Sequence, residues 1–136
     1  MSTANLELVR SIYRSWEAGD FSRTGEWAHP QIESAAFGGP VTGGYTGTEA
    51  IADGWRAMLE LLEDPHPEAE EYLDVDDERI LVLGRLRGRE RSTGEDVEQL
   101  RANLFRIREG LVVRLIFYWD RGRAFDDLGL PPRTGT

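Results

Sequence analysis

Regularly spaced turn signals divide the second half of the chain into four segments of strand length. The candidate strands cover about residues 68–76, 79–91, 96–108 and 111–119. Short breaks containing Asp-Asp-Glu, Ser-Thr-Gly and Arg-Glu-Gly separate them, and residues of these types favour tight turns. The pattern predicts a four-stranded antiparallel meander.

Charge along these segments indicates how the strands pair. Ten acidic residues lie between Glu60 and Glu78, and five arginines follow between Arg79 and Arg91. Opposite charges facing each other across two strands favour that register. Two-residue turns at 77–78 and 93–94 would produce such pairs, namely Glu70 with Arg85, Glu68 with Arg87, Arg89 with Glu98, and Arg91 with Asp96.

Alternation along the strands then sorts the meander into two faces. One face is rich in arginine and carries Leu81, Leu83, Arg85, Arg87, Arg89, Arg91, Leu100, Ala102, Leu104 and Arg106. The other is more apolar and carries Ile80, Val82, Gly84, Leu86, Gln99, Arg101, Asn103, Phe105 and Ile107. We expect the second face to be concave and covered by helices.

The last hairpin allows two registers. A three-residue loop with a left-handed Gly110 pairs Ile107 with Leu111 and keeps Arg114 among the other arginines. A two-residue turn would instead place Arg114 among apolar side chains. We therefore prefer the longer loop, which assigns four residues to the second face: Val113, Leu115, Phe117 and Trp119.

The first half of the chain shows mainly helical patterns. An apolar stripe of helical period predicts a first helix, and it consists of Leu6, Val9, Ile12, Tyr13 and Trp16. A short second helix is predicted over 20–28, followed by a strand over 31–37 and a glycine-rich segment up to residue 44. Capping-box spacing at 46–49 opens a third helix, which Pro65 and Pro67 are expected to stop.

The composition limits the size and the chemistry of the protein. A chain of 136 residues buries roughly two-thirds of its unfolded surface, so we expect one domain over residues 1–136. The sequence contains neither cysteine nor lysine, which excludes disulfides, thiolate metal sites and Schiff-base catalysis. Two isolated histidines and the lack of a phosphate-binding loop predict neither a metal nor a cofactor.

Charge and hydropathy also limit the expected partners and location. The formal net charge of −9 argues against nucleic acid and anionic membranes as partners. No apolar run approaches the ~20 residues needed to span a membrane. The first residues lack a secretory pattern, so we expect a cytoplasmic protein.

Motifs spread over nearly the whole chain carry a resemblance to a known family. They are Trp16-Glu17-Ala18-Gly19-Asp20, His29-Pro30-Gln31-Ile32-Glu33, Tyr45 to Ile51, Arg108 to Arg114, Tyr118-Trp119-Asp120-Arg121 and Leu128-Gly129-Leu130. In this order and spacing, the chain resembles SnoaL-like members of the nuclear transport factor 2-like, or cystatin-like, superfamily. That superfamily includes ketosteroid isomerases, limonene-epoxide hydrolases, polyketide cyclases and proteins without catalysis.

The resemblance implies an α+β fold shaped as a cone or half-barrel. A curved mixed or antiparallel sheet of about five to six strands would pack against three helices from the N-terminal half, with a short C-terminal helix. The resemblance also implies a mostly apolar pocket for a small molecule and a homodimer through the outer sheet face. Leu81, Leu83, Leu100 and Leu104, mixed with arginines, make that outer face a suitable interface.

The catalytic residues of the two best-understood activities are missing. By this resemblance, Ile12 and Ala35 occupy the tyrosine and general-base positions of the ketosteroid isomerases, and Asn103 occupies the position of their second acid. Phe117 occupies the place of the water-activating aspartate of the epoxide hydrolases. Neither reaction is expected in its usual form.

Arg101 and Asn103 are the leading catalytic candidates. They lie two residues apart on one strand, so both point to the predicted concave face, and Gly84 opposite Asn103 is expected to leave space beside it. A guanidinium held against apolar walls stabilises an anion or enolate without transferring a proton. The alternative is that Arg101 reaches the mouth of the cone or pairs with Glu33.

Two carboxylates are candidates for proton transfer. Glu33 could act as a general base if its side of the first strand, shared with Ala35 and Phe37, faces the pocket. Otherwise it is a surface residue or a structural partner of Arg101. Asp120 is the second candidate, but residues 120–125 also read as an N-capped helix ending at Gly129, which we prefer.

Six aromatic residues could line a substrate pocket or simply fill the core: Tyr13, Trp16, Trp55, Phe105, Phe117 and Trp119. Two functions remain open. One is a cofactor-independent isomerase, cyclase or hydrolase acting on an apolar carbonyl- or epoxide-bearing molecule. Arg101 and Asn103 would stabilise negative charge while Glu33 or Asp120 moves the proton. The other is a non-catalytic ligand-binding or dimerisation module.

Overall fold

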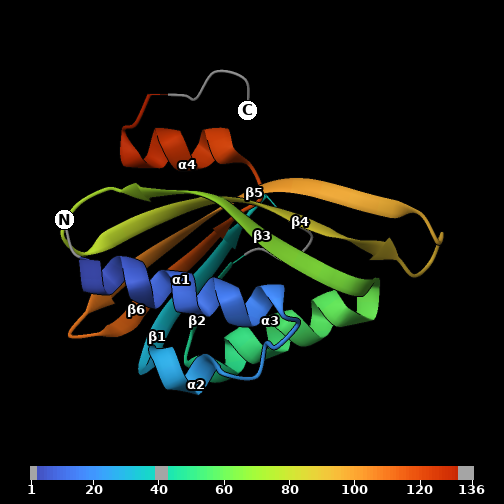
Figure 1. Cartoon of the computed structure of the whole chain (residues 1–136), viewed down its shortest axis with the longest axis horizontal. Helices are drawn as coiled ribbons and strands as arrows, with labels where there is room; N and C mark the ends of the chain where they lie inside the picture. Colours follow the sequence, from blue (N-terminus) through green and yellow to red (C-terminus); the bar gives the residue numbers. More distant parts are fainter. Residues whose placement is uncertain (1–2, 39–42, 132–136) are drawn as a thin grey trace.

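The computed structural model describes residues 3–38 and 43–131. These residues form one six-stranded sheet in the order β2-β1-β6-β5-β4-β3, with α1, α2 and α3 on one face and α4 on the other (Figure 1). The elements are α1 (Thr3–Glu17), α2 (Thr24–Trp27), β1 (Ala28–Phe37), β2 (Gly43–Thr46), α3 (Thr48–Leu61), β3 (Leu62–Asp74), β4 (Arg79–Glu90), β5 (Asp96–Arg108), β6 (Leu111–Tyr118) and α4 (Arg121–Leu128).

The predicted fold class is confirmed. β1 runs parallel to β6, and every other neighbouring pair is antiparallel, so the curved sheet is mixed. Strand β2 was not predicted; it pairs with β1 beside the glycine-rich segment, of which residues 39–42 lie outside the described ranges. Among the described residues, no helix is long and apolar enough to cross a membrane.

The main core lies between the inner face of the sheet and α1. The predicted first helix and its apolar face are confirmed, because Val9, Ile12, Tyr13 and Trp16 are all buried against the sheet. From the sheet, Ile80 and Phe105 pack against them. The apolar face of the meander is therefore the covered one, as predicted.

A second core lies on the outer face beneath α4. Leu81, Leu83 and Leu104 are buried there together with Phe125 of α4. Only Leu100 of the four predicted interface leucines is exposed, at 36%. The chain's own helix thus covers most of the apolar surface on which the homodimer prediction was based, and the homodimer itself stays a prediction.

The segment around His29 differs from the prediction. α2 spans only Thr24–Trp27, because Asp20 instead closes a turn in which it accepts hydrogen bonds from Ser22. α2 ends within one residue of the predicted end, and β1 begins at Ala28, so His29 and Pro30 lie inside the strand. His29 Nδ1 accepts a hydrogen bond from the Gln31 backbone over 2.9 Å.

The prolines after α3 also lie in a strand. Pro65 and Pro67 belong to β3, which begins at Leu62 rather than near residue 68. β3 forms an edge of the sheet, where a residue without a backbone N–H is tolerated because one side of the strand needs no partner.

The β3–β4 register differs from the predicted one by a bulge. Glu68 lies opposite Arg85, and the register shifts between Ala69 and Glu71, so Glu70 is the extra residue. A Cβ atom on Gly84 would lie 2.4 Å from the Glu68 carbonyl oxygen, so the bulge requires glycine there. The space expected beside Gly84 is therefore filled by β3 backbone, and Gly84 lies opposite Arg101, not Asn103.

The β4–β5 and β5–β6 registers also differ from the predicted ones, but the residues after each shift still point to the predicted face of the sheet. Arg89 pairs with Asp96, a shift of two residues from the prediction, which preserves every side-chain direction. In the last hairpin, Glu109 and Gly110 both have positive φ and form the two-residue turn that we had rejected. A bulge at Val113 then restores Arg114 to the outer face, and Val112 takes the buried inner position assigned to Val113.

Candidate functional site

Aromatic side chains from helices and strands meet on the inner face. Tyr13 and Trp16 of α1 contact the Phe105 ring at centroid distances of 6.0 and 6.1 Å. Trp55 of α3 lies 4.9 Å from Trp16 and 6.2 Å from Phe117. Five of the six predicted aromatic residues therefore form one connected cluster, and Trp119 lies beside it.

Tyr13 and Asn103 form a polar pair inside this cluster. Asn103 Nδ2 donates to the Tyr13 hydroxyl oxygen over 2.7 Å, joining residues 90 positions apart in the sequence. Tyr13 is almost fully buried, and burial raises the pKa of its hydroxyl well above the ordinary value. The phenol is therefore neutral at physiological pH and retains its proton for donation to another acceptor.

Arg101 stacks on Trp119 next to that pair. Its guanidinium carbon lies 4.1 Å from the centre of the Trp119 ring. Arg101 and Asn103 lie two residues apart on β5, opposite Gly84 and Val82 of β4, and so point to the same inner face. Burial lowers the pKa of Arg101 to about 10, which still leaves it charged at neutral pH.

Several polar atoms of this region lack partners. Within the described part of the chain, Arg101 Nε, Asn103 Oδ1 and the indole nitrogen of Trp55 are buried without a hydrogen bond. Buried polar groups are normally paired. Two donors and one acceptor on one face of the sheet are therefore left without a partner in the protein.

Glu33 does not join this site. On β1 it pairs with Arg114 of β6 and is exposed, whereas its neighbour Ile32 is buried in the inner core. Ala35 and Phe37 pack in the outer core under α4, so the side of β1 that carries Glu33 faces outward. The structure does not bring Glu33 within reach of Arg101.

Asp120 occupies a capping position. Its side chain accepts a hydrogen bond from the Gly122 backbone over 2.9 Å, and α4 ends at a left-handed Gly129. The preferred interpretation of this segment as a capped helix is confirmed. The exposed carboxylate is not on the inner face.

Sequence reasoning missed the polar role of Tyr13. The resemblance placed Ile12 at the isomerase tyrosine position, but Ile12 is an apolar core residue and Tyr13 is the residue that contacts Asn103. The signal was present, because Tyr13 carries the only hydroxyl in the apolar stripe of α1.

The described residues offer no obvious metal site. Within ranges 3–38 and 43–131, no group of three or more metal-ligating side chains is close enough to hold an ion. Two surface hollows of about 520 Å³ each lie elsewhere. One is lined by Glu63, Asp64, Arg87, Gly88, Arg89, Asp96, Val97 and Glu98, and the other by Leu8, Ser11, Ile12, Arg14, Ser15, Ala18, Asp20, Arg23, Glu26 and Trp27.

Several solved structures share this fold. An NTF2-like protein from Burkholderia thailandensis is 22% identical, with a TM-score of 0.77 over 96% of this chain and 100% of that chain. TerC, co-crystallized with polyporic acid, is 18% identical, with a TM-score of 0.75 over 93% of this chain and 98% of that chain. A Jannaschia protein named as a SnoaL-like polyketide cyclase is 18% identical, with a TM-score of 0.72 over 96% of this chain and 94% of that chain.

These TM-scores show a shared fold. No curated protein matches the chain. The family model of the SnoaL-like domain matches residues 9–115, which is most of the sequence. The protein therefore belongs to the SnoaL-like domain family.

Proposed function

We propose that this protein binds a small, largely apolar molecule on the inner face of its sheet. Arg101 and Tyr13 donate hydrogen bonds to an oxygen of that molecule, and Asn103 Oδ1 accepts one from a hydroxyl or N–H of it. The observation that carries the proposal is the group of buried, unpaired polar atoms among aromatic rings. Apolar walls with a few converging polar groups are typical of small-molecule sites. The co-crystallization of TerC with polyporic acid supports a small organic ligand in this fold.

Nuclear magnetic resonance with methyl naphthyl ketone as the probe tests this proposal. Each of the four tryptophans contributes one indole N–H signal. Binding on the inner face is expected to shift the signals of Trp55 and Trp119 more than that of Trp27, whose ring contacts Trp16 at a centroid distance of 6.0 Å. Absence of shifts at Trp55 and Trp119 up to millimolar ketone would contradict the proposal.

Catalysis at the same site is the second candidate. It is favoured by the neutral phenol of Tyr13, whose free proton lies beside the charged Arg101. Donors aimed at a carbonyl oxygen stabilise the negative charge that forms when the neighbouring carbon loses a proton. Neither Glu33 nor Asp120 faces this site, so the proton would leave to water or to a second group on the substrate.

Deuterium exchange distinguishes the two candidates. If the site stabilises an enolate, the protein accelerates exchange of the ketone's methyl protons in deuterated water, and Tyr13→Phe reduces the acceleration while leaving ketone binding largely intact. Binding without any accelerated exchange would identify a non-catalytic binding protein.

A further inference from the structure

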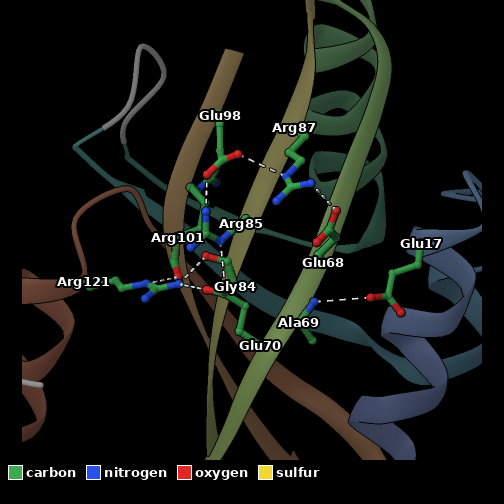
Figure 2. A network of polar contacts seen from close by, with 10 residues as sticks. All are labelled: Glu17, Glu68, Ala69, Glu70, Gly84, Arg85, Arg87, Glu98, Arg101 and Arg121. Atoms are coloured by element: carbon green, nitrogen blue, oxygen red, sulfur yellow. Dashed lines mark hydrogen bonds and ion pairs between the residues drawn. The ribbon is translucent and has the colours of Figure 1, made fainter. Parts of the chain in front are cut away.

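Among the described residues, Arg121 is buried and Arg101 is partly buried, and the surroundings of the two differ. Arg121 at the start of α4 is 8% exposed and has three hydrogen-bond acceptors around its guanidinium, as Figure 2 shows. It donates to Glu70 over 2.6 Å, to the Gly84 carbonyl over 2.7 Å and to the Arg101 carbonyl over 3.2 Å. Its charge and its donors are therefore satisfied by the protein itself.

Arg101 lacks such compensation. No ion pair joins it to any acid within residues 3–38 and 43–131. Its Nε donor is buried without a partner. A buried charge that keeps its proton at neutral pH and has no counter-charge is strongly unfavourable. Among the described residues no negative charge compensates Arg101, so a bound anion would stabilise the arrangement.

The local geometry indicates the shape of that counter-charge. The guanidinium carbon lies 4.1 Å from the centre of the Trp119 ring, so the indole covers one side of the group. The N–H groups of a guanidinium lie along its planar edge. A planar oxyanion such as a carboxylate or an enolate matches such an edge with two parallel hydrogen bonds. Asn103 Oδ1, two residues along the same strand face, is an unpaired acceptor for a hydroxyl or N–H of the same ligand.

The rest of the ligand is defined by the surrounding rings. Phe117 lies opposite Asn103 on β6, and Trp55 packs edge-on against it. Aromatic edges and faces at these distances accept another flat ring in stacked or edge-on contact.

We infer that the physiological ligand is an aromatic organic anion, whose ionised oxygen pairs with Arg101 while its ring packs against Phe117 and Trp55. This inference rests on the proposed function, since it names the ligand class of the same inner-face site. The net charge of −9 makes the whole protein repel anions, so the preference has to come from this one local cation.

Calorimetric titration with two probes of equal shape tests the charge of the ligand. Naphthoate carries a carboxylate, and naphthamide carries a neutral amide in the same place. The wild-type protein at pH 7 is expected to bind naphthoate at least tenfold more tightly than naphthamide, because only the former neutralises Arg101.

Variants locate the source of this preference. Arg101→Met is expected to bind naphthamide about as well as the wild type and to lose the preference for naphthoate. Arg114→Met is the matched control, because it removes one exposed arginine of the outer face and should leave the preference unchanged. Arg101→Gln also removes the charge but leaves a side chain of a different shape, so it checks that the charge causes the effect.

The outcomes separate the two proposals. Equal affinity of the wild type for both probes, or a preference that survives in Arg101→Met and Arg101→Gln, would overturn the anion assignment while leaving small-molecule binding in place. Failure of both probes and of the ketone to bind at millimolar concentration would overturn the proposed function as well.

Discussion

Replacement of Arg101 by methionine is expected to stabilise the ligand-free protein. Each pKa unit corresponds to about 1.4 kcal/mol, so a pKa lowered by burial to about 10 corresponds to about 3 kcal/mol of unfavourable burial of the charged side chain. Loss of the contact with Trp119 removes about 1 kcal/mol of favourable cation–π attraction. Methionine fills the space of the aliphatic stem. The free energy of unfolding should rise by about 2 kcal/mol as the difference of these contributions.

Arg121→Met is the matched comparison and should have the opposite effect. It leaves Glu70 without that partner and removes donors from two backbone carbonyls, so we expect a loss of about 3 kcal/mol. Arg114→Met, at an exposed position, should change stability by less than about 0.5 kcal/mol. The three variants remove the same charge from three different environments.

Urea denaturation followed by far-ultraviolet circular dichroism measures these changes, provided that the m-values agree. The effect of pH provides an independent check. Because the pKa of Arg101 is lowered in the folded state, the unfavourable burial is fully present below about pH 10 and decreases as the pH rises from there toward the ordinary pKa of arginine. The difference in the free energy of unfolding between Arg101→Met and the wild type should therefore become smaller at alkaline pH. If Arg101→Met is destabilised as Arg121→Met is, the charge of Arg101 is compensated and the argument for an external anion fails.

Three further substitutions test other parts of the structure. Gly84→Ala should lower the free energy of unfolding by about 1–3 kcal/mol in urea denaturation, since its Cβ would lie 2.4 Å from the Glu68 carbonyl; an unchanged midpoint would contradict the bulge. Asp120→Ala should cost about 1 kcal/mol of stability through the lost cap, and calorimetry should show unaltered ligand binding; weakened binding would instead indicate a role in the site. Burial, together with the hydrogen bond to Asp127, raises the pKa of Tyr118 to about 12, so above pH 10 the unfolded chain loses the phenol proton first and stability falls. The free energy of unfolding of Tyr118→Phe should therefore fall less steeply with pH above pH 10 than that of the wild type. Equal slopes for the two proteins would show that Tyr118 does not cause the decline.

The faces of the meander could be predicted even where the registers could not. Side-chain direction has a period of two residues, so the two-residue error at Arg89 left every inward and outward assignment unchanged. The error at the last hairpin was cancelled by a bulge at Val113, which returned Arg114 to the outer face. Bulges depend on contacts with the neighbouring strand, and no local signal in the sequence marks them.

In strand β1, the alternation of apolar and polar residues does not predict which side faces the inner core. Glu33, Ala35 and Phe37 on one side are about as apolar as Ile32, Ser34 and Ala36 on the other. Cores exist on both faces of the sheet, one beneath α1 and one beneath α4, so both sides of β1 contact apolar residues. The outward direction of Glu33 follows only from the parallel pairing of β1 with β6.

Local patterns therefore account for the order of the elements, the capped C-terminal helix and the shared direction of Arg101 and Asn103, because each depends on residues close together in the chain. The tertiary fold alone decides that Tyr13 bonds to Asn103, and that Arg121 is paired with an acid while Arg101 is not. Such partners lie tens of residues apart, and the burial that gives them their chemistry exists only once the sheet and helices have packed together.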